Sequence, residues 1–212
     1  MAELPLVIHG CGTQGRAIIE FVRESGQFPD LLLADDDQAL WGTTVFGMPV
    51  LSPELALGGG PRRFLCAIAD NEIRETVTGR ALAGGHRPCS VIHPTAIVSP
   101  SAEIGEGTIL MARTAVNTGA TVGRGCLLNT GCIVEHYSVV GEFSHLASGS
   151  LMGGGSRVGS GAFLGMGAIV LPRTSVGNGS VVGAGAVVNR DVDSSIVVVG
   201  NPARVLRALK RS

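Results

Sequence analysis

The sequence predicts two structural classes in one chain: a small parallel α/β unit over residues 1–90 and an all-β parallel β-helix over residues 91–212. In the first part, strand-like apolar runs alternate with helical patterns. In the second, a six-residue repeat runs without interruption, which is typical of a parallel β-helix. The composition agrees, because 32 glycines and only 4% aromatic residues suit many turns around a thin aliphatic core.

The elements of the first unit follow from its apolar runs. Three such runs predict three strands, at residues 4–9, 31–34 and 64–69. A helical pattern follows the first strand, and a second helix is expected to start at an N-cap, Asp70 or Asn71, and to end near Ala83. The alternation of strands and helices predicts a parallel sheet.

A glycine-rich motif joins the first strand to the first helix. Gly10, Gly12 and Gly15 form the pattern G-x-G-x-x-G in the context that this motif requires, and Asp35 and Asp36 lie about 20 positions further on. The motif indicates a phosphate at a helix N-terminus, with one of the two carboxylates on a ribose or base. A tight turn without a ligand is the alternative. Ninety residues supply one mononucleotide-binding half, so a Rossmann-like half domain for a nucleotide or nucleotide sugar is predicted rather than a dehydrogenase.

The repeat of the second unit places an aliphatic residue at every sixth position from Ile92 to Val188, which makes seventeen positions. The residue two places earlier is always small. The aliphatic side chain is expected to point inward, and three hexads form one triangular coil, so residue n stacks on residue n + 18 at about 4.8 Å. Glycines directly follow the aliphatic residue on one face, where a turn with positive φ is expected. They are Gly105, Gly123, Gly141, Gly159 and Gly177. After the repeat, the basic tail 204–211 is expected to be helical.

His136 is the strongest candidate for chemistry in the repeat. It lies two residues after an inward aliphatic position, at a turn, and the 18-residue period stacks Gly154 directly on it. This arrangement pairs a general base with a backbone N–H that could stabilise an oxyanion. A solvent-facing turn residue is the alternative for His136, and a structural role is the alternative for His145. The two histidines lack a third ligand, so no metal site is predicted, and the cysteines of the repeat, Cys126 and Cys132, occupy core positions.

The charge, the apolar runs and the cysteines limit the classes of partner and the cellular compartment that we expect. A net charge of −1 without a basic stripe disfavours nucleic acid. No apolar stretch reaches the length of a membrane span, and no secretory signal precedes the first strand. Five cysteines without a C-x-x-C pair argue against a disulfide framework, so a cytoplasmic protein is expected.

Three segments together resemble a known family: 68–74, 92–102 and, most specifically, the block from Leu128-Asn129-Thr130 through Glu135-His136 to His145. They are similar to bacterial sugar acetyltransferases of the PglD/NeuD type, and most similar to those that N-acetylate nucleotide-linked amino sugars (UDP-4-amino-sugar type). The resemblance covers almost the whole chain. It implies a homotrimer of left-handed β-helices, with acetyl-CoA in the groove between neighbouring helices and the nucleotide amino sugar on the first unit.

The resemblance also implies roles for individual residues. His136 matches the catalytic base, and Gly154 and His145 match residues at the acetyl thioester of acetyl-CoA. The expected substrate-binding residues are Gly10, Gly12, Gln14, Gly15, Asp35, Asp36, Asn71 and Asn129.

Two positions depart from the family pattern. Tyr137 stands where an acidic neighbour of the catalytic histidine is common, and Gln14 where the glycine-rich turn usually carries histidine. Glu135 is not expected to replace the acid, because successive strand residues point in opposite directions. The prediction is therefore N-acetyl transfer, with O-acetylation of sialic acid or another sugar, and a non-catalytic nucleotide-sugar-binding protein, as the alternatives.

Overall fold

The computed structural model describes residues 4–209. The chain divides into two compact units, one up to Val91 and one from Ile92 onward.

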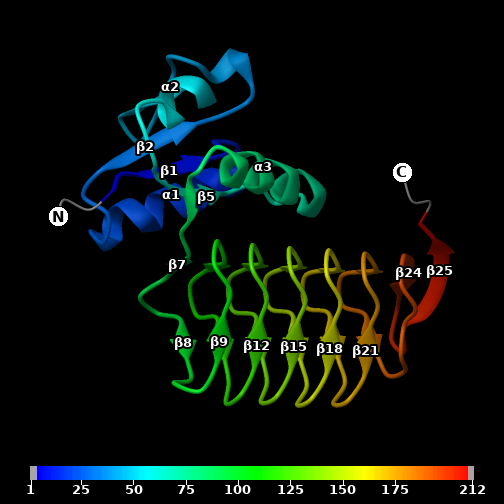
Figure 1. Ribbon diagram of the computed structural model, residues 1–212. Helices are drawn as coiled ribbons and strands as arrows, with labels where there is room; N and C mark the ends of the chain where they lie inside the picture. Colours follow the sequence, from blue (N-terminus) through cyan, green and yellow to red (C-terminus); the bar gives the residue numbers. More distant parts are fainter. Residues whose placement is uncertain (1–3, 210–212) are drawn as a thin grey trace. The chain divides into compact units, whose positions relative to one another are not determined.

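The first unit is built on a six-stranded sheet with the order β3-β4-β2-β1-β5-β6 (Figure 1). Its strands are β1 (Leu6–His9), β2 (Leu31–Ala34), β3 (Thr44–Val45), β4 (Met48–Leu51), β5 (Arg63–Cys66) and β6 (Arg87–Pro88). All neighbours are parallel except the β3–β4 hairpin. The three predicted strands are β1, β2 and β5. β1 lies in the centre, and its residues Leu6, Val7 and Ile8 are fully buried.

Three α-helices accompany the sheet: α1 (Thr13–Ser25), α2 (Pro53–Leu57) and α3 (Asn71–Ala83). A short 3₁₀ turn, η1 (Gln38–Leu40), follows β2. Asp70 is the N-cap of α3, where its side chain accepts a hydrogen bond from the Ile73 N–H at 3.0 Å. The β3–β4 hairpin and α2 were not predicted, although Ser52-Pro53 is a helix-start signal that the structure uses.

The second unit is a stack of triangular coils made of two-residue strands (Figure 1). They are β7 (Val91–Ile92), β8 (Ile97–Val98), β9 (Glu103–Ile104), β10 (Ile109–Leu110), β11 (Ala115–Val116), β12 (Thr121–Val122), β13 (Leu127–Leu128), β14 (Ile133–Val134), β15 (Val139–Val140), β16 (His145–Leu146), β17 (Leu151–Met152), β18 (Arg157–Val158), β19 (Phe163–Leu164), β20 (Ile169–Val170), β21 (Ser175–Val176), β22 (Val181–Val182) and β23 (Val187–Val188). They form three parallel sheets, one for each side of the coil. The predicted parallel β-helix is thereby confirmed.

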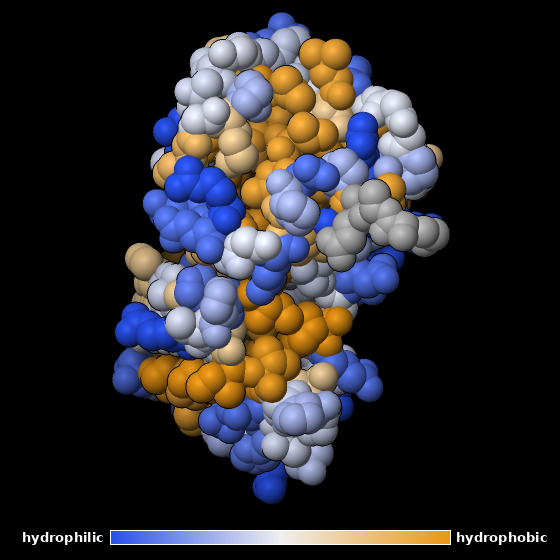
Figure 2. Space-filling view, turned by 90° about the vertical axis from the view of Figure 1, so that its left-hand side faces the viewer, coloured by the Kyte–Doolittle hydropathy of each residue, from blue (hydrophilic) through white to orange (hydrophobic). Residues whose placement is uncertain are grey.

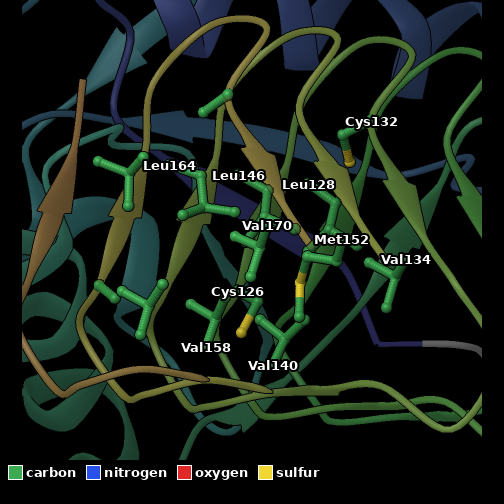
Figure 3. Packing of buried hydrophobic residues seen from close by; sticks show 14 of the residues in the cluster. Cys126, Leu128, Cys132, Val134, Val140, Leu146, Met152, Val158, Leu164 and Val170 are labelled. Atoms are coloured by element: carbon green, nitrogen blue, oxygen red, sulfur yellow. The ribbon is translucent and has the colours of Figure 1, made fainter. Parts of the chain in front are cut away.

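The predicted 18-residue stacking is present in the strand register. Val116 pairs with Val134, which pairs with Met152, and so on along the sheet. The aliphatic residues of the repeat point into the space that the coils enclose (Figure 3). Ile92 is an exception, since 36% of it is exposed. It lies in the first coil, where no preceding coil covers it. Figure 2 views the molecule from this side and shows hydrophobic residues at the surface of the β-helical unit.

The predicted position of the left-handed turns was wrong by two residues. Positive φ recurs at every sixth residue from Gly107 to Gly185, whereas Gly141 and its equivalents do not have it. Gly141 is required for another reason: a β-carbon there would lie 2.6 Å from the backbone carbon of Gly159 in the next coil. Most of the left-handed corners are glycine, and the exceptions are Arg113, Tyr137, Phe143 and Arg173.

The end of the chain differs from the prediction. The last coil is closed by β24 (Ile196–Val199), which pairs with β22, and β25 (Arg204–Ala208) pairs antiparallel with β24. The predicted helix over the basic tail was therefore wrong for its described part, because the chain turns back and extends the sheet. Residues 210–212 lie outside the described residues.

Candidate functional site

His136 lies in the turn that follows β14, and 59% of its side chain is exposed. Its Nδ1 is 3.2 Å from Oε2 of Glu135. Because an ionised carboxylate can only accept, Nδ1 donates to it and Nε2 is left as the acceptor. The imidazole is thus held in the tautomer that a general base needs at Nε2.

The contact with Glu135 corrects the expectation that this side chain points away from His136. Strict alternation of side chains holds within a strand, but β14 ends at Val134 and Glu135 already belongs to the turn. The same carboxylate oxygen is 3.3 Å from the backbone N of His136. Glu135 therefore takes the place of the acidic neighbour that is missing at Tyr137.

Gly154 lies against the imidazole of His136, as the 18-residue stacking predicts. A β-carbon at Gly154 would overlap Nε2 and would lie 2.6 Å from Cε1, so only glycine leaves room for the ring. The next residue, Gly155, donates its N–H to the carbonyl oxygen of His136 at 2.9 Å. Among the hydrogen bonds of residues 4–209, none uses the Gly154 N–H as donor, so this N–H is available to a ligand.

A hollow of about 330 Å³ opens at this corner of the β-helix. Three successive coils line it, with His136 and Tyr137 on the first, Gly154 and Gly155 on the second, and Pro172 and Arg173 on the third. The hollow exists because the middle coil carries glycines between two coils with large side chains. Arg173 was not predicted, although it lies two 18-residue steps after Tyr137 and could have been found by the same stacking.

His145 and Asn129 lie on another side of the coil. His145 is in β16, where it is 8% exposed and packs edge-on against Phe163 with 5.1 Å between ring centroids. Asn129 follows β13, and its backbone N–H donates to the carbonyl oxygen of Leu146 at 2.8 Å. These two residues are therefore neighbours through adjacent coils, whereas His136 follows a strand of a different sheet.

In the first unit, the glycine-rich turn has the geometry that its pattern predicts. Gly10 adopts φ +108°, and a β-carbon on Gly15 would overlap the carbonyl oxygen of Gly10. Gly12 is the N-cap of α1, with no side-chain cap and open space where a β-carbon would lie. No acidic residue lies in the first turn of α1, which contains Gln14. The N-terminus of α1 is thus accessible and suited to an anion.

Asp35 and Asp36 lie after β2, at the same edge of the sheet. Oδ2 of Asp35 accepts the backbone N–H of Cys11 at 2.7 Å, which ties the end of β2 to the glycine-rich turn. Burial, together with Asp35, raises the pKa of the Cys11 thiol to about 12. Asp36 forms an ion pair with Arg80 of α3. Asp35 therefore supports the turn, and Asp36 is the more accessible of the two carboxylates.

Asn71 and His9 also lie at this edge of the sheet. Asn71 accepts a hydrogen bond from Nη2 of Arg74 at 2.7 Å, and Arg74, which is fully buried, also donates to carbonyl oxygens of the loop after β5. His9 is 2% exposed, and its Nε2 is 3.6 Å from Oδ2 of Asp36. Burial lowers the pKa of His9, and Asp36 opposes this effect. His9 and Arg80 also line a cavity of about 260 Å³ between α2 and α3.

Residues 4–209 contain neither a metal-ligand cluster nor a membrane-spanning helix. No group of three or more His, Cys, Asp or Glu side chains there is placed to hold a metal ion. In the same part of the chain, no helix is both long and apolar enough to cross a bilayer.

Comparisons with known proteins agree with the repeat. Residues 155–190 match the family model "Bacterial transferase hexapeptide (six repeats)". The comparison with curated proteins gave no match.

Several solved structures are similar over nearly the whole chain. The acetyltransferase domain of PglB from Neisseria gonorrhoeae is 34% identical, with a TM-score of 0.91, and the match covers 96% of this chain and 100% of that one. A perosamine N-acetyltransferase from Caulobacter crescentus is 35% identical over 97% of this chain. The chain belongs to the hexapeptide-repeat sugar N-acetyltransferases. Another structure similar to this N-acetyltransferase is PerB from Caulobacter crescentus in complex with CoA and GDP-perosamine. It is 36% identical, with a TM-score of 0.87, and covers 97% of this chain and 100% of that one. WeeI from Acinetobacter baumannii is 28% identical, with a TM-score of 0.88, over 95% and 99% of the two chains.

Proposed function

We propose that this N-acetyltransferase transfers the acetyl group of acetyl-CoA to the amine of a nucleotide-linked amino sugar, with His136 as the general base. One observation carries the proposal: Nε2 of His136 faces Gly154, whose N–H is not used as a donor within residues 4–209. A base and an oxyanion donor thus meet at one point, as acyl transfer requires. The related PerB structure holds CoA and a nucleotide amino sugar, which supports both substrates.

The reaction would proceed without a covalent enzyme intermediate. The sugar amine forms a bond to the thioester carbon while Nε2 of His136 takes its proton. The N–H of Gly154 donates to the oxygen that becomes negative in the tetrahedral intermediate. The carbon–sulfur bond then breaks, and the proton on the imidazolium passes to the sulfur, so that coenzyme A leaves as the thiol. Glu135 keeps the imidazole oriented and stabilises its charged form through Nδ1.

The first unit would act as a Rossmann-like half domain that binds the nucleotide. Its glycine-rich turn offers the N-terminus of α1 to the phosphates, and Asp36 is the carboxylate accessible to the ribose or base. Gln14 and Asn71 lie at the same edge of the sheet. The sequence resemblance favours a UDP-linked sugar, whereas the related PerB binds a GDP-linked one. Acceptors linked to either nucleotide are therefore candidates.

A homotrimer of left-handed β-helices fits the outer surface of the second unit. The outward residues of one sheet form an aliphatic column, each only partly buried or exposed within one chain. They are Ile97, Ala115, Ile133, Leu151, Ile169 and Val187. A neighbouring copy would cover this column. It would also bring the sheet that carries its own His145 and Asn129 toward the acetyl-CoA groove.

We expect the reaction to take place in the cytoplasm. The five cysteines are free thiols, and a reducing compartment keeps thiols in this state.

The test is thiol release from acetyl-CoA with a panel of UDP- and GDP-linked amino sugars and their hydroxyl counterparts. We expect release only with the amines, and a fall in kcat of roughly 10²–10⁴-fold in His136→Ala with acetyl-CoA binding retained. Release with hydroxyl acceptors would instead support O-acetylation. Binding of the sugars without any release would support a nucleotide-sugar-binding protein, and near-normal kcat in His136→Ala would refute the role of the base.

A further inference from the structure

Tyr137 occupies a backbone conformation that a large side chain rarely adopts. It lies at one of the left-handed corners of the β-helix, with φ 55°, where most equivalent residues are glycine. For a residue with a β-carbon, this conformation costs about 1–2 kcal/mol. Tyr137 occupies this corner in spite of the cost. Arg173, which also has a positive φ, lines the same hollow. Two strained corners therefore border the candidate site.

The ring of Tyr137 is held in place on one side and free on the other. A β-carbon at Gly119, one coil earlier, would lie 2.6 Å from Cδ1 and Cε1 of the ring, so one edge of the ring packs against that glycine. The ring and the imidazole of His136 are nearly perpendicular, with a centroid distance of 6.1 Å and an interplanar angle of 89°. Nevertheless 67% of Tyr137 is exposed. An aromatic ring that packs against the preceding coil thus borders the hollow beside His136.

The place of an acceptor follows from the role of His136. An amine that gives its proton to Nε2 lies within about 3 Å of this atom, so the carbons that carry the amine extend into the hollow. The C–H groups on one face of a hexose form an apolar surface, which packs well on an aromatic ring. Glu135 already contacts Nδ1 of His136, and Tyr137 is therefore free for a ligand contact instead of an orienting one.

We propose that Tyr137 determines acceptor specificity by packing its ring against the apolar face of the amino sugar's hexose. This inference rests on the proposed function and adds a residue that binds the acceptor. It also predicts which kinetic constant changes: the KM for the acceptor, and not kcat or the KM for acetyl-CoA.

Tyr137→Gly is the decisive variant, because glycine relieves the left-handed strain and keeps the backbone N–H that donates to Thr118. We expect no loss of thermal stability, because the strain is relieved, together with an increase of about tenfold in the acceptor KM and an unchanged KM for acetyl-CoA. Tyr137→Phe should restore the acceptor KM, since the ring and not the hydroxyl makes the contact. Arg113→Gly is the matched control: it removes an exposed side chain from an equivalent corner, φ 58°, that does not line the hollow, and should change no kinetic constant.

Two results would overturn the inference. An unchanged acceptor KM in Tyr137→Gly would show that the ring does not touch the sugar. A fall in kcat at constant acceptor KM would show that Tyr137 acts through His136. Failure of the proposed function is distinguishable from both, because the wild-type protein would then acetylate none of the amino sugars.

Discussion

Replacing Gly154 by alanine tests the geometry of the site with a single methyl group. The added β-carbon would overlap Nε2 of His136 and lie 2.6 Å from Cε1, whereas carbon atoms in contact prefer about 3.5–4.0 Å. The imidazole would therefore have to move by about 1 Å. It can do so without unfolding the protein, because it is the exposed end of a side chain. A displacement of this size at a reacting group costs about a hundredfold in rate.

The assay combines kcat, from thiol release with saturating amino sugar, and thermal unfolding. We expect Gly154→Ala to lose about two orders of magnitude in kcat and to unfold at the wild-type temperature. Gly141→Ala is the contrasting variant, since its β-carbon would strike the backbone of the next coil and should destabilise the protein by about 1–3 kcal/mol. Gly79→Ala in α3, where the β-carbon meets open space, should keep full activity. Normal kcat in Gly154→Ala, or a loss of stability like that of Gly141→Ala, would refute the reasoning.

Two further predictions concern charged groups. Glu135→Gln removes the anionic acceptor at Nδ1 of His136 and should lower kcat roughly tenfold at unchanged KM for both substrates; steady-state kinetics decide this, and an unchanged kcat would contradict it. Because burial lowers the pKa of His9 in the folded protein below its usual 6.5, the unfolded chain binds a proton that the native one does not as the pH falls below about 6.5. Stability should therefore fall from pH 7.5 to pH 5.5, and His9→Gln should lose less; equal losses in urea unfolding would count against this account.

Most of the β-helix could be predicted from the sequence because the inward-pointing residue recurs at a fixed interval of six along the chain. A period of six determines which residues point inward, and three hexads per coil determine which residues stack, so the contact between His136 and Gly154 followed from counting. The positions of the positive φ angles did not follow, since glycine at Gly141 reflects the approach of the next coil and not a left-handed turn.

The details that sequence reasoning missed depend on where strands end and on distant partners. Glu135 was assigned to a strand, but the strand stops one residue earlier and the turn brings its carboxylate to His136. The ion pair of Asp36 with Arg80 joins residues 44 positions apart, and no periodic pattern marks it. The hairpin of β3 and β4 has strands of two and four residues, too short for a periodic signal.

The stacking of coils also limits how the length of this protein can change. Insertion of one residue inside a coil, with the six-residue period otherwise kept, would turn the later aliphatic side chains of all three sheets from the interior to the surface. Removal of eighteen residues, in contrast, deletes one whole coil and returns the chain to the same phase. The β-helix can therefore be shortened or lengthened only in steps of a coil, unless a loop at a corner absorbs the difference. Such a loop would alter the outline of the corner it joins, so a change in length at the corner of Gly154 would reshape the candidate site without disturbing the core.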